Sequence, residues 1–246
     1  MTVQIEWYTY MNNGFTNRPD IDISSTQSLD RVSVDIVNNY PNYQYYQCPA
    51  FQDSLKDTFI LRSPVDISIR INKKNNIFQV ASSLQEIIIN RPSEDTKYQS
   101  FSFTYLFNFI SKHDDIMLEQ LPAFYHKNDF TDKCQIIIGQ FNIGKWIRPI
   151  QLGDVVVTTD SEEDIFIHIK RGDAISYVRF KCKDDMKLNR LEDIDEIYLS
   201  IQRSEACTRV KQFSPKLSLK KLYDIFKPFN QKYKKSCPFN IFKKGE

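Results

Sequence analysis

The chain is poor in glycine, histidine and cysteine, and it contains no long apolar run. Its six glycines form no glycine-rich phosphate loop, and its five cysteines lie far apart without a Cys-x-x-Cys pair. We therefore expect no zinc ribbon and no disulfide framework, but free thiols in a reducing compartment. No stretch approaches the roughly 20 apolar residues of a membrane-spanning helix, and the first residues lack the pattern of a secretory signal. These absences predict a soluble protein that makes no membrane contact.

Large aromatic side chains are plentiful instead. The 246 residues include 18 phenylalanines and 13 tyrosines. Hydrophobic residues make up 41% of the chain and charged residues 26%, which is ordinary for a globular protein. The length suits one large domain or two small ones. We expect a core built from flat rings.

Charge is distributed unevenly along the chain. Residues 211–246 contain ten lysines and only two acidic residues, which gives this segment a charge of +8, whereas residues 1–210 carry −6. The sequence therefore predicts a β-rich domain over residues 1–210 and a basic, aromatic segment over residues 211–246. Such a segment either packs on its own acidic body or binds a polyanion.

Short stretches with the two-residue period of β-strands run through most of the chain. In VQIEWYTY, residues 3–10, one face is apolar and the other carries Gln4, Glu6, Tyr8 and Tyr10. FSFTYLFNFI, residues 101–110, places five rings on one face of a single predicted strand. More such stretches follow closely between residues 134 and 182 without helical patterns between them. We predict a mainly β fold, an antiparallel β-sandwich or barrel-like core.

Helical spacing is clear only near the end of the chain. Leu219, Leu222, Tyr223 and Phe226 fall at i, i+3, i+4 and i+7, and Ser218 is the expected N-cap. A C-terminal amphipathic helical segment packed on the β domain is therefore predicted. Residues 32–37 fit either a strand or a helical turn, and residues 194–202 are ambiguous.

The same C-terminal segment is a candidate nucleic-acid interface. Aromatic rings alternate there with lysines, of which the candidate contacts are Lys220, Lys221, Lys234 and Lys235. Rings that stack on bases beside a cationic track are typical of proteins that bind single strands. However, no arginine follows Arg209, and helical spacing of rings is more often the mark of a core-facing side.

The three histidines offer one catalytic hypothesis. His113 and Asp115 form a His-x-Asp pair, His168 follows downstream, and Arg179 comes 11 positions later. That order resembles the iron(II) and 2-oxoglutarate-dependent oxygenases, in which two histidines and a carboxylate hold the metal and an arginine binds the cosubstrate. The pattern lacks that family's small residues after the second histidine. For His168, a structural position on a strand is the alternative interpretation.

FNIGKWIRPIQLG, residues 141–153, joins two predicted strands. We expect Trp146 to be buried at one end of the sandwich and Pro149 to restrict strand pairing there. Arg148 is the candidate binding residue, because an arginine beside a buried ring needs an acceptor. If the acceptor is a carboxylate of the same chain, this segment is a structural corner, which we favour; if Arg148 faces a pocket, it is a ligand clamp.

Three motifs resemble an uncharacterised family of tailed bacteriophages over roughly residues 32–182. The first is Cys-Pro, a threonine and Pro-x-Asp, here Cys48, Pro49, Thr58, Pro64 and Asp66. The second is Gly-x-Phe followed by Trp-x-Arg-Pro, residues 139–149, and the third is Gly-Asp-x-Ile-x-Tyr-Val-x-Phe, residues 172–180. The resemblance implies a viral origin and a β-rich fold, and no reaction.

The favoured hypothesis is a phage-encoded, non-enzymatic binding protein that acts, without a cofactor, on a host or viral macromolecule, for which a host or phage protein is expected. We expect it in the host cytoplasm, with association with the virion as the alternative. One alternative is the oxygenase, with iron(II) and 2-oxoglutarate as cofactors. The second alternative is nucleic-acid binding through residues 211–246. The oligomeric state is left open.

Overall fold

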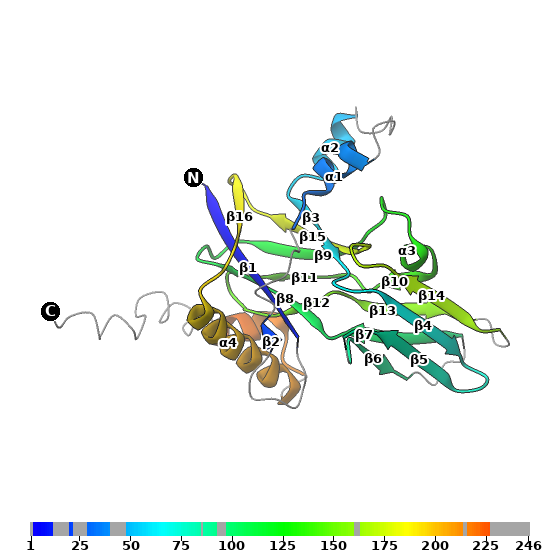
Figure 1. Cartoon of the computed structure of the whole chain (residues 1–246). Helices are drawn as coiled ribbons and strands as arrows, with labels where there is room; N and C mark the ends of the chain where they lie inside the picture. Colours follow the sequence, from blue (N-terminus) through cyan, green and yellow to red (C-terminus); the bar gives the residue numbers. More distant parts are fainter. Residues whose placement is uncertain are drawn as a thin grey trace.

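The computed structural model describes residues 2–11, 20–21, 29–39, 48–84, 86–92, 97–159, 163–213 and 216–226. Within them the chain forms four β-sheets, with α1 and α2 projecting on one side and α4 lying along another (Figure 1). Every strand pair within the described residues is antiparallel except β1 with β16. The mainly β, antiparallel fold class is confirmed.

The sheets are assembled from short strands. The first contains β12 (Ile150–Gln151), β8 (Tyr105–Ser111), β1 (Val3–Met11) and β16 (Met186–Arg190), with β2 (Asp20–Ile21) beside β1. The second contains β10 (Cys134–Ile136), β13 (Asp154–Thr158), β7 (Tyr98–Phe103) and β6 (Ile88–Arg91). The third contains β11 (Gly139–Asn142), β9 (Met117–Pro122), β15 (Ala174–Lys181) and β3 (Thr58–Arg62). The fourth contains β14 (Ile165–Ile169), β4 (Ile67–Asn72) and β5 (Ile77–Ser82).

One hydrophobic cluster draws side chains from all four sheets, including Ile5, Leu61, Ile69 and Phe101. The five rings predicted on one face are all buried: Phe101, Phe103, Tyr105, Phe107 and Phe109. The prediction of a single strand over residues 101–110 is wrong, however. The chain breaks at Thr104, so that the first two rings belong to β7 in the second sheet and the other three to β8 in the first. Rings from one continuous stretch therefore join two sheets.

Two ambiguous stretches are helices. Residues 32–37 fall in α1 (Val32–Asn39), which buries Val32, Asp35 and Ile36. Residues 194–202 begin α4 (Ile194–Phe213), a 20-residue helix that continues across residue 210. The remaining short helices are α2 (Pro49–Ser54) and α3 (Asp129–Lys133).

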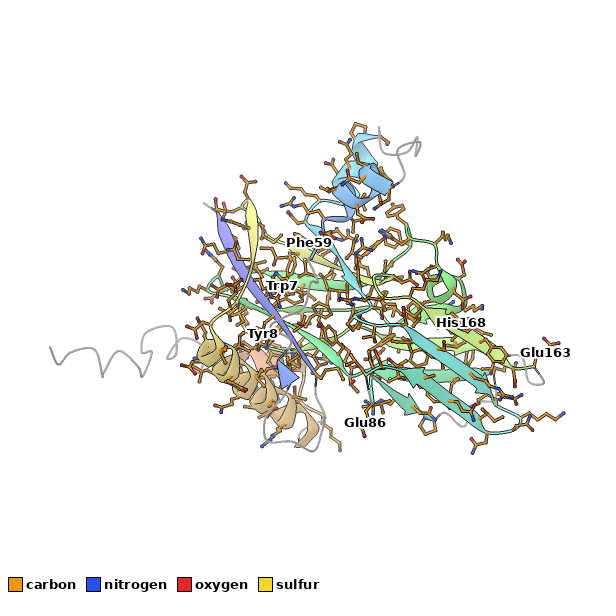
Figure 2. The ribbon with its side chains drawn as sticks, viewed as in Figure 1. Trp7, Tyr8, Phe59, Glu86, Glu163 and His168 are labelled. Atoms are coloured by element: carbon orange, nitrogen blue, oxygen red, sulfur yellow. The ribbon has the colours of Figure 1, made fainter. Side chains whose placement is uncertain are left out.

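Helix α4 covers the outer face of β1. Tyr8 and Tyr10, predicted on the polar face of that strand, are each only 2% exposed and pack with Ile197 and Ile201 of the helix. Tyr8 lies on β1 in Figure 2, and its hydroxyl accepts a hydrogen bond from the side-chain amide of Asn108 on β8. The buried hydroxyl of Tyr8 is thus paired, as burial requires.

The C-terminal amphipathic helix is present at residues 219–226. The backbone N–H of Lys221 donates to Oγ of Ser218, which confirms the expected cap. Leu222 and Phe226 are buried in the main cluster. The hydroxyl of Tyr223 accepts a hydrogen bond of 2.7 Å from the backbone N–H of Asn142 on β11. The helix is therefore packed on the β domain.

Candidate functional site

The segment at residues 141–153 turns from β11 to β12 around a buried ring. Trp146 is 3% exposed and meets Phe141 and Tyr223 edge to face, with centroids 6.1 and 6.2 Å apart. Arg148 is exposed, and its guanidinium carbon lies 5.6 Å from the Trp146 ring centre and 5.9 Å from that of Phe141. Contacts with two ring faces hold this cation in place.

Arg148 also lines a cleft of about 650 Å³, a size within the usual range for ligand sites. We call this the Arg148 cleft; its walls come from β6, β7, β8, β9, β11, β12, β13 and α4. Its charged lining residues are Arg91, Arg148 and Asp154. Among the residues that the structure describes, neither arginine is within ion-pair distance of a carboxylate. The cleft therefore has an excess of positive charge.

Arg91 is positioned by hydrogen bonds across the second sheet. Its Nε donates to Oγ of Ser102 over 3.2 Å, and that hydroxyl donates to Oδ1 of Asp154 over 2.6 Å. The three residues lie on neighbouring strands, β6, β7 and β13; the register pairs Ser102 with Asp154 directly, and Arg91, opposite Ser100, reaches Ser102 diagonally. Asp154 thus acts on Arg91 through the serine.

The lip of the cleft is apolar. Ile137 and Ile138, between β10 and β11, are 54% and 64% exposed, the highest values among the large apolar side chains that the structure describes. Deeper in the cleft, the side-chain N–H groups of Gln120 bind the backbone oxygens of Gln151 and Leu152. A cationic interior beside an apolar lip suits a ligand that carries both an anionic group and aliphatic surface.

The proposed iron ligands do not meet. Asp115 lies in the loop after β8 and forms an ion pair with Lys145. His168 lies on β14 of the fourth sheet, beside Ser68 (Figure 2). Across the described ranges, no group of three or more His, Cys, Asp and Glu side chains is arranged to hold a metal ion, and His113, Asp115 and His168 are all within them. Arg179 faces Glu119, with Nε 3.6 Å from its carboxylate. The fold therefore does not assemble the oxygenase constellation.

The lysine candidates are only partly placed. Lys220 and Lys221 are exposed on the helix at residues 219–226, opposite its buried side. Lys234 and Lys235 lie outside the described residues. The two placed lysines occupy the solvent-facing side of an amphipathic helix.

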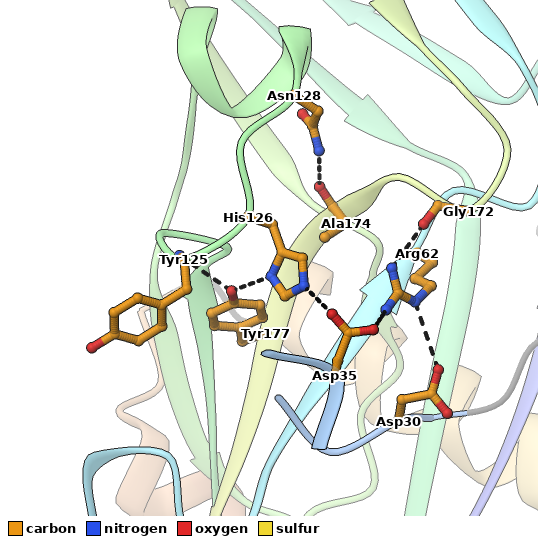
Figure 3. Close-up of polar contacts among 9 residues, drawn as sticks. All are labelled: Asp30, Asp35, Arg62, Tyr125, His126, Asn128, Gly172, Ala174 and Tyr177. Atoms are coloured by element: carbon orange, nitrogen blue, oxygen red, sulfur yellow. Dashed lines mark hydrogen bonds and ion pairs between the residues drawn. The ribbon is translucent and has the colours of Figure 1, made fainter. Parts of the chain in front are cut away.

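The third histidine forms a buried polar network that we did not predict (Figure 3). His126, Asp35 and Tyr177 are 6%, 9% and 0% exposed. Nε2 of His126 lies 2.7 Å from Oδ2 of Asp35, and Nδ1 lies 2.5 Å from the hydroxyl of Tyr177. That hydroxyl also accepts from the backbone N–H of Tyr125 over 3.2 Å, so its own proton points to Nδ1 and the imidazole donates through Nε2.

Arg62 completes the network. Its guanidinium binds Oδ1 of Asp35, lies 3.8 Å from a carboxylate oxygen of Asp30 and donates to the carbonyl of Gly172 (Figure 3). Burial lowers the pKa of His126, although the bond to Asp35 opposes this. Burial alone would raise the pKa of Asp35, but the bond from His126 and the charge of Arg62 outweigh it, so that this pKa is below its ordinary value. The histidine is neutral and the aspartate ionised at neutral pH.

This network resembles a base and its orienting acid, but all three of its members are buried. The Tyr177 hydroxyl, which His126 could activate, is itself fully buried. The network instead joins α1 to β3 and β15.

The buried cysteines are also poor nucleophiles. Burial raises the pKa of the Cys134 and Cys207 thiols to about 12, which keeps them protonated.

No protein-family model, curated protein or solved structure matches the chain. Among the described residues, no helix combines the length and apolar character needed to cross a membrane.

Of the sequence candidates that lie within the described residues, only Arg148 lines the cleft, and Trp146 lies beneath its side chain. Sequence reasoning missed Arg91 and Asp154, which stand 57 and six positions from Arg148 in the chain and share no motif with it. The alternation within β6 and β13 gave no indication that these strands would line a cleft together with Arg148. His126 belongs to none of the sequence motifs, and its partner Asp35 lies in a segment that fitted either a strand or a helix.

Proposed function

We propose that the protein is a phage-encoded, non-enzymatic binding protein that acts in the host cytoplasm and holds a host or phage protein at the Arg148 cleft. The observation that carries the proposal is the pair of cleft arginines without a carboxylate partner among the described residues. Arginine is the side chain best suited to hold an anionic group of a partner at an interface. The exposed isoleucines of the lip add apolar contact area.

A non-enzymatic role agrees with the chemistry of the described residues. His126 is enclosed by its own partners, and the thiols of Cys134 and Cys207 are buried and protonated. The phage origin is supported by the motifs within residues 32–182. The cytoplasmic location is supported by the free state of the four described cysteines, which suits a reducing compartment.

Site-specific photo-cross-linking tests this function. A photoreactive residue replaces Ile138 at the lip, or Phe166, which is 48% exposed on β14 and does not line the cleft. We expect a discrete cross-linked product from position 138, in bacterial cells before or during phage infection, and none of the same mass from position 166. Arg148→Gln should remove the product, whereas Arg209→Gln, on the exposed side of α4, should retain it. Absence of any product, or the same product from both positions, contradicts the proposal.

A further inference from the structure

The Arg148 cleft contains an open strand edge. β11 pairs with β9 alone in its sheet, so its other edge has no strand partner in the described fold. The consecutive residues Gly139, Gln140 and Phe141 all line the cleft. Because successive side chains of a strand point to opposite faces, three consecutive lining residues mean that the backbone of β11 faces the cleft.

The direction of the backbone groups follows from one hydrogen bond. The N–H of Asn142 points away from β9, because it donates to the hydroxyl of Tyr223. In an antiparallel ladder, residues two apart along a strand point their N–H and C=O groups the same way. The N–H and C=O of Gln140 therefore point to the open edge as well. Tyr223 closes one end of this edge, and the cleft lies along the rest.

From this arrangement we infer that the cleft binds an extended acidic peptide segment of the partner protein, added as a strand along β11. Backbone groups of the segment bind the N–H and C=O of Gln140, and one of its carboxylates binds the guanidinium of Arg148. Its aliphatic side chains pack on Ile137 and Ile138. Strand addition of this kind takes affinity from main-chain bonds and specificity from alternate side-chain contacts.

Charge and ring exposure favour a peptide over a nucleic-acid strand. The cleft carries two arginines and one aspartate, and Oδ1 of that aspartate accepts a bond from Ser102. Single-stranded nucleic acids need exposed rings for base stacking, but the cleft rings Phe101 and Phe141 are 0% and 5% exposed. Aliphatic side chains at the lip, with an open strand edge, instead suit an extended polypeptide.

A random peptide-display library, selected on the intact protein, tests the inference. We expect enrichment of segments that alternate aliphatic and acidic residues, with binding that weakens as salt rises. Arg148→Gln should lower the affinity for a selected peptide by roughly tenfold or more, since a charge-assisted bond is lost. Arg209→Gln removes the same charge outside the cleft and should leave affinity within about twofold.

A second pair of variants tests the strand edge. Gln140→Pro removes only the outward N–H, a change that edge strands tolerate, while Gln140→Ala keeps it. We expect the proline variant to lose roughly tenfold in affinity and the alanine variant to bind normally. N-methylation of alternate residues of the selected peptide should abolish binding on one set of positions and spare it on the other.

The inference rests on the proposed function, but the two can fail separately. Enrichment of basic peptides, no enrichment, or selection of single-stranded oligonucleotides in a parallel pool overturns the acidic peptide. Acidic peptides that bind Gln140→Pro normally and tolerate both methylation patterns overturn strand addition. If the peptide experiments give these results while the cross-link at position 138 persists, the inference is wrong and the proposed function stands. If the peptide experiments fail and the cross-link is also absent, the inference and the proposed function are both wrong.

Discussion

Nε2 of His126 lies 2.7 Å from Oδ2 of Asp35, although 91 positions separate the two residues. The second oxygen of Asp35 binds Arg62 of β3. One carboxylate on α1 therefore joins three parts of the chain, and apolar contacts of Val32 and Ile36 with Ile60 and Tyr177 surround it. This polar centre and its apolar surround attach the helix to the third sheet.

Asp35→Ala should destabilise this attachment strongly. The substitution leaves Arg62 and the His126 N–H without their buried acceptor, and removing one member of a buried pair costs about 3 kcal/mol. Urea unfolding followed by circular dichroism measures the loss, and hydrogen exchange should localise it to α1. Asp53→Ala on α2, whose side chain is exposed, is the matched control and should change stability by less than about 0.5 kcal/mol.

The free energy of unfolding should fall as pH drops below 6.5, the ordinary pKa of histidine. In the folded protein the pKa of His126 is lowered by burial, so the unfolded chain takes up a proton first, and protons then favour unfolding. The stability that neutral His126 contributes is fully present above pH 6.5. It is lost progressively as the pH falls from 6.5 to the lowered pKa of His126 in the folded protein. The lowered pKa of Asp35 adds a second loss below its ordinary value of 3.8.

Stability measured in urea from neutral to acid pH checks this dependence. His126→Gln should be less stable at neutral pH and lack the first loss, while His168→Gln, at an exposed position on β14, should retain it. An unchanged profile in His126→Gln would show that another group is responsible.

Leu222→Ala should weaken the packing of the C-terminal helix on the β domain. Leu222 is fully buried in the main cluster, and truncation of such a leucine costs about 3 kcal/mol. Leu219→Ala is the matched control, because Leu219 lies on the same helix and is 39% exposed. Thermal unfolding compares the two, and equal midpoints would contradict the packing described above.

Gly144→Ala should be among the most damaging single-methyl additions. A Cβ at this position would lie 1.9 Å from the carbonyl oxygen of His113, so the backbone of one loop must move. Overpacking of this kind costs about 3 kcal/mol. Gly139→Ala adds the same methyl where nothing lies within 4 Å and should leave the unfolding midpoint nearly unchanged. If the two variants unfold alike, the close approach of these loops is wrong.

Local periodicity predicted the fold class and one helix well. The strand character of β1, the two-residue alternation in β14 and the helical spacing of Leu222 and Phe226 are properties of single elements, and the structure confirms them. The same reasoning merged β7 with β8, because alternation continues across Thr104 without a turn residue. The division at Thr104 becomes apparent only in the tertiary structure, where β7 pairs within the second sheet and β8 within the first.

Helix α4 remained ambiguous for a definable reason. Its buried positions include Ser200 and Ser204 beside Ile197, Ile201 and Cys207. Serines count as polar in a hydrophobic pattern, so the core-facing side of the helix was not apparent. They face the tyrosines of β1, whose burial likewise contradicts the simple division of that strand into an apolar and a polar side.

The sequence by itself determined the strands, the ring-rich core and the cap and apolar side of the C-terminal helix, because these depend on neighbours within a few positions. The tertiary structure decided which sheets the strands join, the pairing of His126 with Asp35 and the position of Arg148 beside an open strand edge. Those relationships depend on packing between elements far apart in the chain. Neither the buried network nor the cleft has a local periodicity that would reveal it.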